Sequence, residues 1–281
     1  MGYFKSVSKK RKRIRKIRLI IFILILLFII IKFINIKVTI NDKYLKYIAL
    51  SSLGIDYMQT KEIKNNTTQV FYEEQIDNPI VYIYNTHQTE SYKYDKLNAY
   101  NIDYTVMFAS YILQDYLYSL GINSIVETSS ISKLLNENNL KYSQSYKASR
   151  ILLEQSIIDS PTLKYFIDIH RDSSVYEKTT CEIDNIKYAK LLFILGLENE
   201  KYLENKVMIE ELNNKLKNIN DCLSRGILEK QGIGVDGVYN QDFNPNTILI
   251  EVGGQYNNIE EVNNSLKVLA SILYEYIMED S

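Results

Sequence analysis

Residues 80 to 90 read Ile-Val-Tyr-Ile-Tyr-Asn-Thr-His-Gln-Thr-Glu, and their pattern recurs further along the chain. The first part, Ile80 to Tyr84, is a short run of β-branched and aromatic residues, which is typical of a buried strand. A polar turn follows at once and contains His87 and, three residues later, Glu90. The pattern predicts a strand that places two metal-ligand side chains at its carboxyl end.

The same order of strand and polar residue occurs twice more. A strand expected from Lys164 to Ile169 ends at His170, and another from Thr247 to Ile250 ends at Glu251. Both histidines of the chain therefore follow expected strands. Functional groups collect beyond the carboxyl ends of strands in open α/β sheets, so these residues can meet despite the long separations in sequence.

Two histidines and one carboxylate are a usual ligand set for catalytic zinc, which keeps a fourth position for water. His87, Glu90 and His170 supply this set, an arrangement used by zinc carboxypeptidases and zinc amidases. Bound Zn²⁺ would lower the pKa of its water, and Glu251 is the candidate to move the proton to a leaving amine. Asp103 is an alternative third ligand, and Glu251 could instead hold a ligating histidine in place.

Expected strands and helices alternate through residues 79–281. Helices are expected from Ile102 to Leu120, about Ser143 to Ile158, roughly Glu200 to Ile219 and Ile259 to Met278, and further strands at Ser124 to Glu127 and Tyr188 to Leu195. Residues 171–187 are expected to form a polar loop, and residues 232–246 a stretch of turns. The alternation predicts an α/β domain with a twisted, mainly parallel sheet and helices on both faces.

The first 37 residues have a different character. Nine Lys or Arg residues lie between positions 5 and 18, and a run of apolar residues from Leu19 to Ile36 follows, interrupted mainly by Lys32. A helix needs about 20 residues to cross a bilayer, so residues 19–37 span it if Lys32 reaches the outer interface. The positive-inside rule then predicts a cytoplasmic tail (1–18) and an extracytoplasmic stalk (38–78) before the domain 79–281. A cleaved signal peptide is the alternative, but the small residues of a cleavage site are absent after Phe33.

The net charge of −1 hides an asymmetry along the chain. Eleven of the 33 Lys and Arg residues lie in the first 37 positions, where there is no acid, so residues 38–281 carry 22 basic and 34 acidic side chains. An acidic domain is a poor ligand for nucleic acid.

In an exported domain, Cys181 and Cys222 either form a disulfide or stay as buried free thiols, and their spacing is not that of a zinc motif.

Five segments of the domain together carry a family resemblance. They are Tyr84-Asn-Thr-His-Gln-Thr-Glu-Ser-Tyr92, Ser145-Tyr-Lys-Ala-Ser-Arg150, Tyr165-Phe-Ile-Asp-Ile-His-Arg-Asp-Ser173, Leu223-Ser-Arg-Gly-Ile227 and Leu249-Ile-Glu-Val-Gly-Gly254. Over roughly residues 78–275 the chain resembles stage II sporulation protein P, a family of membrane-anchored peptidoglycan hydrolases of endospore-forming bacteria. The resemblance implies a fold similar to zinc N-acetylmuramoyl-L-alanine amidases, amidase and endopeptidase action on the stem peptide, and a role in engulfment of the forespore.

By motif, the resemblance also implies roles for single residues. It makes His87 and His170 metal ligands and Glu251 the catalytic carboxylate, and it implies stage II sporulation proteins D and M as partners. Arg171 is the candidate for binding a stem-peptide carboxylate, because a planar guanidinium suits bidentate pairing. The alternative is that Arg171 pairs with Asp172 or Asp168 and only holds the loop.

These observations lead to one hypothesis and two alternatives. The hypothesis is an extracytoplasmic, membrane-anchored zinc hydrolase that cleaves an amide bond in peptidoglycan. A zinc carboxypeptidase acting on cell-wall peptides would use the same His-x-x-Glu spacing, but it would release one terminal residue instead of whole stem peptides. A scaffold that binds the cell wall without cleaving it would release nothing.

Overall fold

The computed structural model describes residues 77–97 and 102–280 of the chain. The basic tail, the expected transmembrane helix (19–37) and nearly all of the expected stalk (38–78) lie outside this part of the chain. Within the described ranges, no helix is both long enough and apolar enough to cross a membrane.

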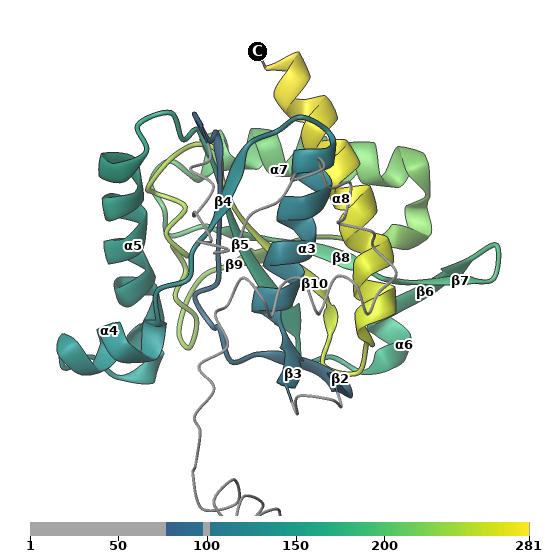
Figure 1. Cartoon of the computed structure of the whole chain (residues 1–281), viewed down its shortest axis with the longest axis horizontal. Helices are drawn as coiled ribbons and strands as arrows, with labels where there is room; N and C mark the ends of the chain where they lie inside the picture. Colours follow the sequence, from purple (N-terminus) through teal and green to yellow (C-terminus); the bar gives the residue numbers. More distant parts are fainter. Residues whose placement is uncertain (1–76, 98–101, 281) are drawn as a thin grey trace, which may run out of the picture. The chain divides into compact units, whose positions relative to one another are not determined.

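A six-stranded sheet forms the centre of the domain, in the order β4-β1-β5-β10-β8-β9 (Figure 1). The strands are β1 (Val81–Tyr84), β4 (Ser124–Val126), β5 (Tyr165–Asp172), β8 (Leu191–Gly196), β9 (Ser224–Lys230) and β10 (Thr247–Gly254). Neighbouring strands are parallel except for β8 and β10, which are antiparallel. The expectation of a mainly parallel α/β sheet is confirmed.

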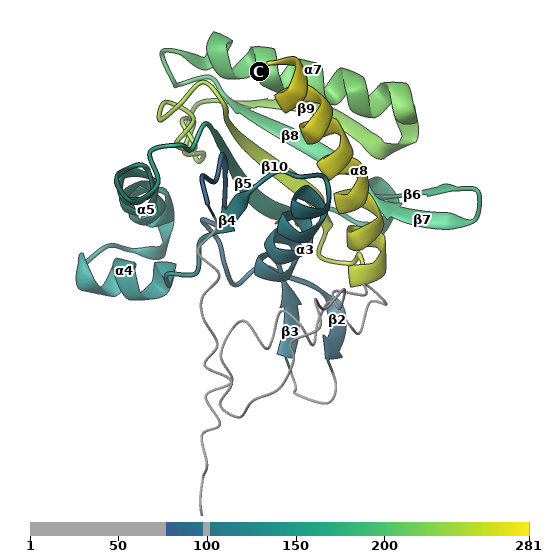
Figure 2. The same cartoon turned by 45° about the horizontal axis from the view of Figure 1, so that its top comes forward.

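Helices cover both faces of this sheet (Figures 1 and 2). Helices α3 (Val106–Ser119), α7 (Tyr202–Ile219) and α8 (Ile259–Glu279) share one apolar core with alternate strand residues such as Val81 and Ile83. On the other face Tyr82 and Tyr84 pack with Leu153 of α5 (Ser145–Asp159). A short helix, α4 (Ile131–Glu137), packs against α5. Because both faces are buried, the central strands are nearly continuous runs of apolar residues.

One expected helix begins later than the sequence suggested. Residues Ile102–Thr105 form strand β3, which pairs antiparallel with β2 (Ser91–Leu97), and α3 begins only at Val106. Ile-Asp-Tyr-Thr alternates apolar and polar residues and pairs with β2, whereas helical spacing of apolar residues starts at Val106. Asp103 therefore lies in a strand, and its side chain is outside the described part of the structure.

The stretch after β5 is also more ordered than a loop. It contains α6 (Tyr176–Thr179) and a hairpin of β6 (Thr180–Ile183) and β7 (Ile186–Ala189). Asp184 and Asn185 form its two-residue turn with positive φ angles of 50° and 63°, as expected for a tight hairpin of this type. The strand expected from Tyr188 to Leu195 is thus divided between β7 and β8. Strand β9 was not expected from the sequence.

The closing helix agrees closely with its expected range. Asn258 accepts a hydrogen bond from the backbone N–H of Glu261, and the Glu261 side chain accepts one from the backbone of Asn258. This reciprocal capping fixes the start of α8. The helix follows β10 directly, so it also fixes the chain just after Glu251.

Candidate metal centre

Three expected ligands meet at the carboxyl ends of β1 and β5. His87 and Glu90 lie in the turn after β1, and His170 lies in the neighbouring parallel strand β5. One ligand atom from each of the three lies within 4.8 Å of the others. The sequence placed His170 and Glu251 just after their strands, but β5 continues to Asp172 and β10 to Gly254. Strand geometry therefore fixes both side chains.

Glu90 bridges the two histidines. Its Oε1 lies 3.5 Å from Nδ1 of His87, and its Oε2 lies 3.6 Å from Nδ1 of His170. The backbone N–H of Arg171 donates to Oε2 at 3.0 Å. Burial acts to raise the pKa of Glu90, but these contacts outweigh it and hold the pKa well below its usual value. Glu90 is therefore an ionised carboxylate that faces two imidazole nitrogens.

Asp168 contacts the opposite side of the His170 ring. It is fully buried, and its Oδ1 lies 2.9 Å from Nε2 of His170, although without the alignment of a hydrogen bond. Thr86 holds this carboxylate through its backbone N–H at 2.9 Å and its hydroxyl at 2.6 Å. Burial opposes protonation of His170, but Asp168 and Glu90 outweigh it and raise the pKa of His170 well above its usual value.

The donor set fits a zinc ion. The second ring nitrogen of a metal-bound histidine usually faces a carboxylate, a backbone carbonyl or water, which fixes ring orientation. His170 has that partner in Asp168, while Nδ1 of both histidines faces the same carboxylate. The sequence analysis missed this role of Asp168. Its signal was the Asp-x-His spacing, because residues two apart in a strand point to the same face.

Glu251 lies beside His170, as its register partner in β10. Its Oε2 is buried and has no hydrogen-bond partner among the described residues. Burial raises the pKa of Glu251 to about 7, with a further contribution from Glu90 and an opposing one from His170. A carboxylate that titrates near neutral pH, with one free oxygen, can accept and return a proton.

Aromatic rings line one side of the two histidines. The ring of Tyr142 stacks on His87 at 5.3 Å between centroids, and 59% of Tyr142 is exposed. Tyr146 stacks on His170 at 6.4 Å and packs edge-to-face against Tyr239 at 5.2 Å. The sequence analysis assigned no role to these tyrosines, although Tyr146 lies within the Ser145–Arg150 motif. They give the candidate site an apolar wall on the side of α5.

Arg171 does not form either of its expected carboxylate pairs. Its Nε donates to the backbone oxygen of Ser91 at 3.0 Å, and its Nη1 donates to the backbone oxygen of Asp172 at 3.4 Å. The carboxylate of Asp172 pairs instead with Arg225, at 2.6 Å. Arg171 thus ties the start of β2 to β5 and holds Glu90 through its own N–H. Its contact with substrate stays a prediction.

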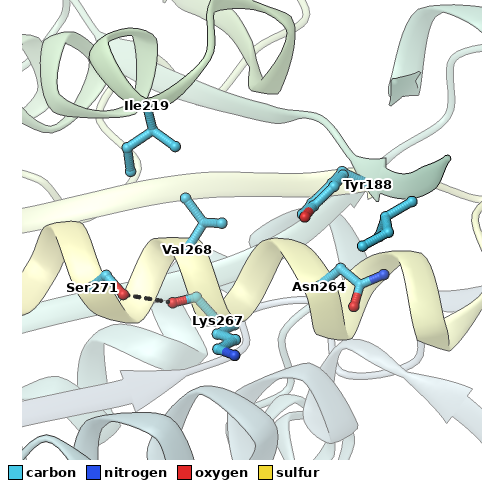
Figure 3. A pocket seen from close by; sticks show the side chains of 7 residues that line it. Tyr188, Ile219, Asn264, Lys267, Val268 and Ser271 are labelled. Carbon is cyan, nitrogen blue, oxygen red and sulfur yellow. Dashed lines mark hydrogen bonds between the residues drawn. The ribbon is translucent and has the colours of Figure 1, made fainter. Parts of the chain in front are cut away.

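A separate hollow of about 420 Å³ lies away from these residues, between β7, α7 and α8 (Figure 3). It is lined by Ile186, Tyr188, Ile219, Asn264, Lys267, Val268 and Ser271. None of the expected site residues contributes to this lining. The chemistry of the domain is therefore expected at the strand ends and not in this hollow.

Comparison with solved structures gives distant likenesses. N-acetylmuramoyl-L-alanine amidase AmiC2 of Nostoc punctiforme is 12% identical with a TM-score of 0.41, and the match covers 72% of this chain and 98% of that one. The CwlD amidase from Clostridioides difficile, solved in complex with the GerS lipoprotein, is 18% identical with a TM-score of 0.42, covering 71% and 97%. Cwp6 from Clostridium difficile is 14% identical with a TM-score of 0.43, covering 72% and 29%.

Comparison of sequences is more decisive. The model of the family described as stage II sporulation protein P matches residues 37–274. Stage II sporulation protein P of Bacillus subtilis (strain 168) is 33% identical over 205 residues, which are 71% of this chain and 51% of that protein. The chain therefore spans about half the length of this curated relative. With the motifs around His87, His170 and Glu251 inside the matched region, the chain belongs to the stage II sporulation protein P family.

Proposed function

We propose that this chain is a zinc-dependent N-acetylmuramoyl-L-alanine amidase that degrades peptidoglycan during sporulation. The observation that carries the proposal is the pairing of a His-Glu-His ligand set with a buried carboxylate, Glu251, that has a free oxygen and a raised pKa. Membership of a sporulation protein family supports the biological setting.

His87, Glu90 and His170 would hold the zinc ion. When bound, the ion would polarise a carbonyl oxygen and make a water molecule acidic. Asp168 keeps the His170 ring in its orientation, and the backbone N–H of Arg171 keeps the Glu90 carboxylate turned toward the histidines. The ligands are thus positioned before any metal arrives, which reduces the cost of binding.

Glu251 would act as the proton carrier. Its ionised carboxylate takes a proton from the water whose oxygen attacks the lactyl carbonyl carbon of muramic acid. It then gives that proton to the nitrogen of L-alanine as the C–N bond breaks, so the products are a carboxyl group and a free amine. A pKa of about 7 allows Glu251 to act as base and then as acid near neutral pH.

The test is digestion of purified sacculi by the full-length protein in detergent, with mass spectrometry of the soluble products. Release of whole stem peptides that stops with a chelator and returns with zinc supports the amidase. Release of single terminal residues would indicate the carboxypeptidase, cleavage inside the stem peptide would show the endopeptidase activity, and binding without release would indicate a scaffold. Glu260→Gln, a change to an exposed acid of α8, serves as the control for changes at the site.

We further propose that the chain is a single-pass membrane protein with its catalytic domain outside the cytoplasm. The basic residues before position 19 and the apolar run after it support this orientation. In such a location, stage II sporulation proteins D and M are the expected partners. Protease added to intact protoplasts should remove the domain and spare the tail; a domain that is protected until lysis would contradict the orientation.

A further inference from the structure

The two cysteines are far apart in sequence but meet in the fold. Cys181 lies in β6, and Cys222 lies in η2 (Asp221–Leu223), the short turn that follows α7. β6 packs against η2, and Cys222 packs against the apolar core that contains Cys181. The two side chains are close enough for Cys222 to raise the pKa of Cys181. Both are free thiols in the structure.

The two thiols differ in solvent exposure, so an oxidant reaches one of them before the other. Cys181 is 7% exposed and belongs to the main apolar core, whereas Cys222 is partly exposed at its edge. Burial raises the pKa of Cys181 to about 12, with a smaller contribution from Cys222. Cys222 is therefore the thiol that an external reagent reaches first, and the buried Cys181 is the thiol that reacts second.

The pair joins two supports of the candidate site. From Cys222 the chain continues into β9, where Arg225 pairs with Asp172 beside Glu251. On the other side, Thr180, next to Cys181, accepts a hydrogen bond at 2.6 Å from Asn257, whose side chain also accepts one from Gly254 at the end of β10. A covalent bond here would tie β6 to η2, directly before the start of β9.

The same pair lies next to the hollow of Figure 3. Tyr188 is the register partner of Cys181 in the β6–β7 hairpin, and Ile219 ends α7 three residues before Cys222. Figure 3 shows Tyr188 and Ile219 around this hollow together with Val268 of α8. A bond between the cysteines would hold these two walls at a fixed spacing.

We propose that Cys181 and Cys222 are a disulfide-forming pair that closes when the domain reaches an oxidising compartment. This rests on the proposed extracytoplasmic location, because thiols in the cytosol are kept reduced. The step is an exchange with a disulfide of a thiol oxidoreductase or of a small molecule such as oxidised glutathione. Cys222 attacks that disulfide and releases one thiol, then Cys181 attacks the mixed disulfide and releases the second, so two electrons and two protons pass to the oxidant.

We expect the disulfide to raise the stability of the domain and to leave its rate of hydrolysis nearly unchanged. The bond would close a loop of about 40 residues, and such cross-links reduce the entropy of the unfolded chain. We expect the oxidised protein to melt roughly 5–10 °C above the reduced protein. The site residues already meet without the bond, so hydrolysis at 25 °C should differ less than about threefold between the two forms.

The experiment treats the purified full-length protein with oxidised or reduced glutathione and then blocks free thiols with an alkylating reagent. A digest of the oxidised sample should contain one cross-linked pair of peptides holding Cys181 and Cys222. The melting shift should vanish in Cys222→Ser, a change at a partly exposed position, and in the Cys181→Ala/Cys222→Ala double variant. Full alkylation of both cysteines in the folded protein after oxidation, or glutathione left attached to Cys222 alone, would overturn the proposal.

A second arm separates this inference from the proposed function. Sporulating cells are quenched with acid and alkylated before lysis, and the peptides are examined for the cross-link. One outcome is that the purified protein forms the disulfide while both cysteines are found as free thiols in cells. That result would overturn the disulfide in the cell and indicate a cytosolic domain. Neither arm depends on amidase activity, so an inactive but cross-linked protein would refute only the catalytic proposal.

Discussion

Glu90 and Glu251 reach the candidate site from segments on either side of β5, and their environments are opposite. Glu90, from the turn after β1, contacts both histidines and a backbone N–H, and its pKa is lowered. Glu251, from β10, keeps a buried oxygen without a partner among the described residues, and its pKa is raised to about 7. Two carboxylates whose pKa values are pushed apart divide the work of a site: the ionised one suits a metal and the other moves protons.

The sharpest test of this division is Glu251→Gln. The variant keeps the size of the side chain but cannot carry a proton, so we expect hydrolysis of sacculi to fall about 10³-fold while zinc stays bound. Product release by mass spectrometry and zinc content are measured on the same sample. Activity within threefold of the parent, with Glu260→Gln as the matched control, would remove Glu251 from the mechanism.

Glu90→Gln should lower zinc affinity, whereas Glu251→Gln should leave it unchanged. Losing the ionised carboxylate between His87 and His170 should weaken zinc binding by about 100-fold or more, because a neutral amide is a poorer zinc ligand. Competition with a chromophoric chelator measures the affinity. Added zinc should restore part of the hydrolysis in Glu90→Gln but none in Glu251→Gln; the same zinc affinity as the parent would show that Glu90 is not a ligand.

Asp168→Asn tests the support behind His170. The amide keeps the shape but loses the charge that orients the ring, so we expect zinc affinity to fall about 10–100-fold. The same chelator competition applies, with Asp242→Asn, at an exposed position, as the control. An unchanged affinity in a folded Asp168→Asn variant would mean that packing alone fixes the imidazole.

The raised pKa of Glu251 also predicts a pH dependence in the metal-free protein. Between about pH 4.5 and 7 the unfolded chain ionises this group while the folded protein keeps it protonated, so its contribution to stability falls as pH rises. Relative to the parent, the free energy of unfolding of Glu251→Gln should rise by about 3 kcal/mol between pH 4.5 and pH 8. Urea unfolding measures the difference in free energy of unfolding between the variant and the parent. If this difference does not grow with pH, the pKa of Glu251 is not raised by burial.

The sequence predicted the parts of the fold that repeat a local signal. β1, β5 and β10 are short apolar runs, and each ends close to a ligand or catalytic candidate, so His87, His170 and Glu251 could be named in advance. Helix α8 could also be placed, because its apolar spacing is regular and Asn258 caps it.

The remaining features depend on contacts between distant segments. Ile102 to Thr105 became a strand because β2 is available to pair with it, and local spacing does not reveal that partner. The role of Asp168 depends on Thr86, which belongs to a different segment. Tyr142 and Tyr146 line the site only because α5 packs beside β1 and β5, and the meeting of Cys181 with Cys222 likewise depends on the fold.

Zinc X-ray absorption on the purified protein, after its metal content has been determined, can establish which side chains hold the ion. We expect one zinc per chain with nitrogen and oxygen ligands at about 2.0–2.1 Å, including two imidazoles, and the same spectrum in Glu251→Gln. Sulfur at about 2.3 Å, or a spectrum that changes in Glu251→Gln and not in Glu90→Gln, would contradict the assignment of the ligands and of the proton carrier.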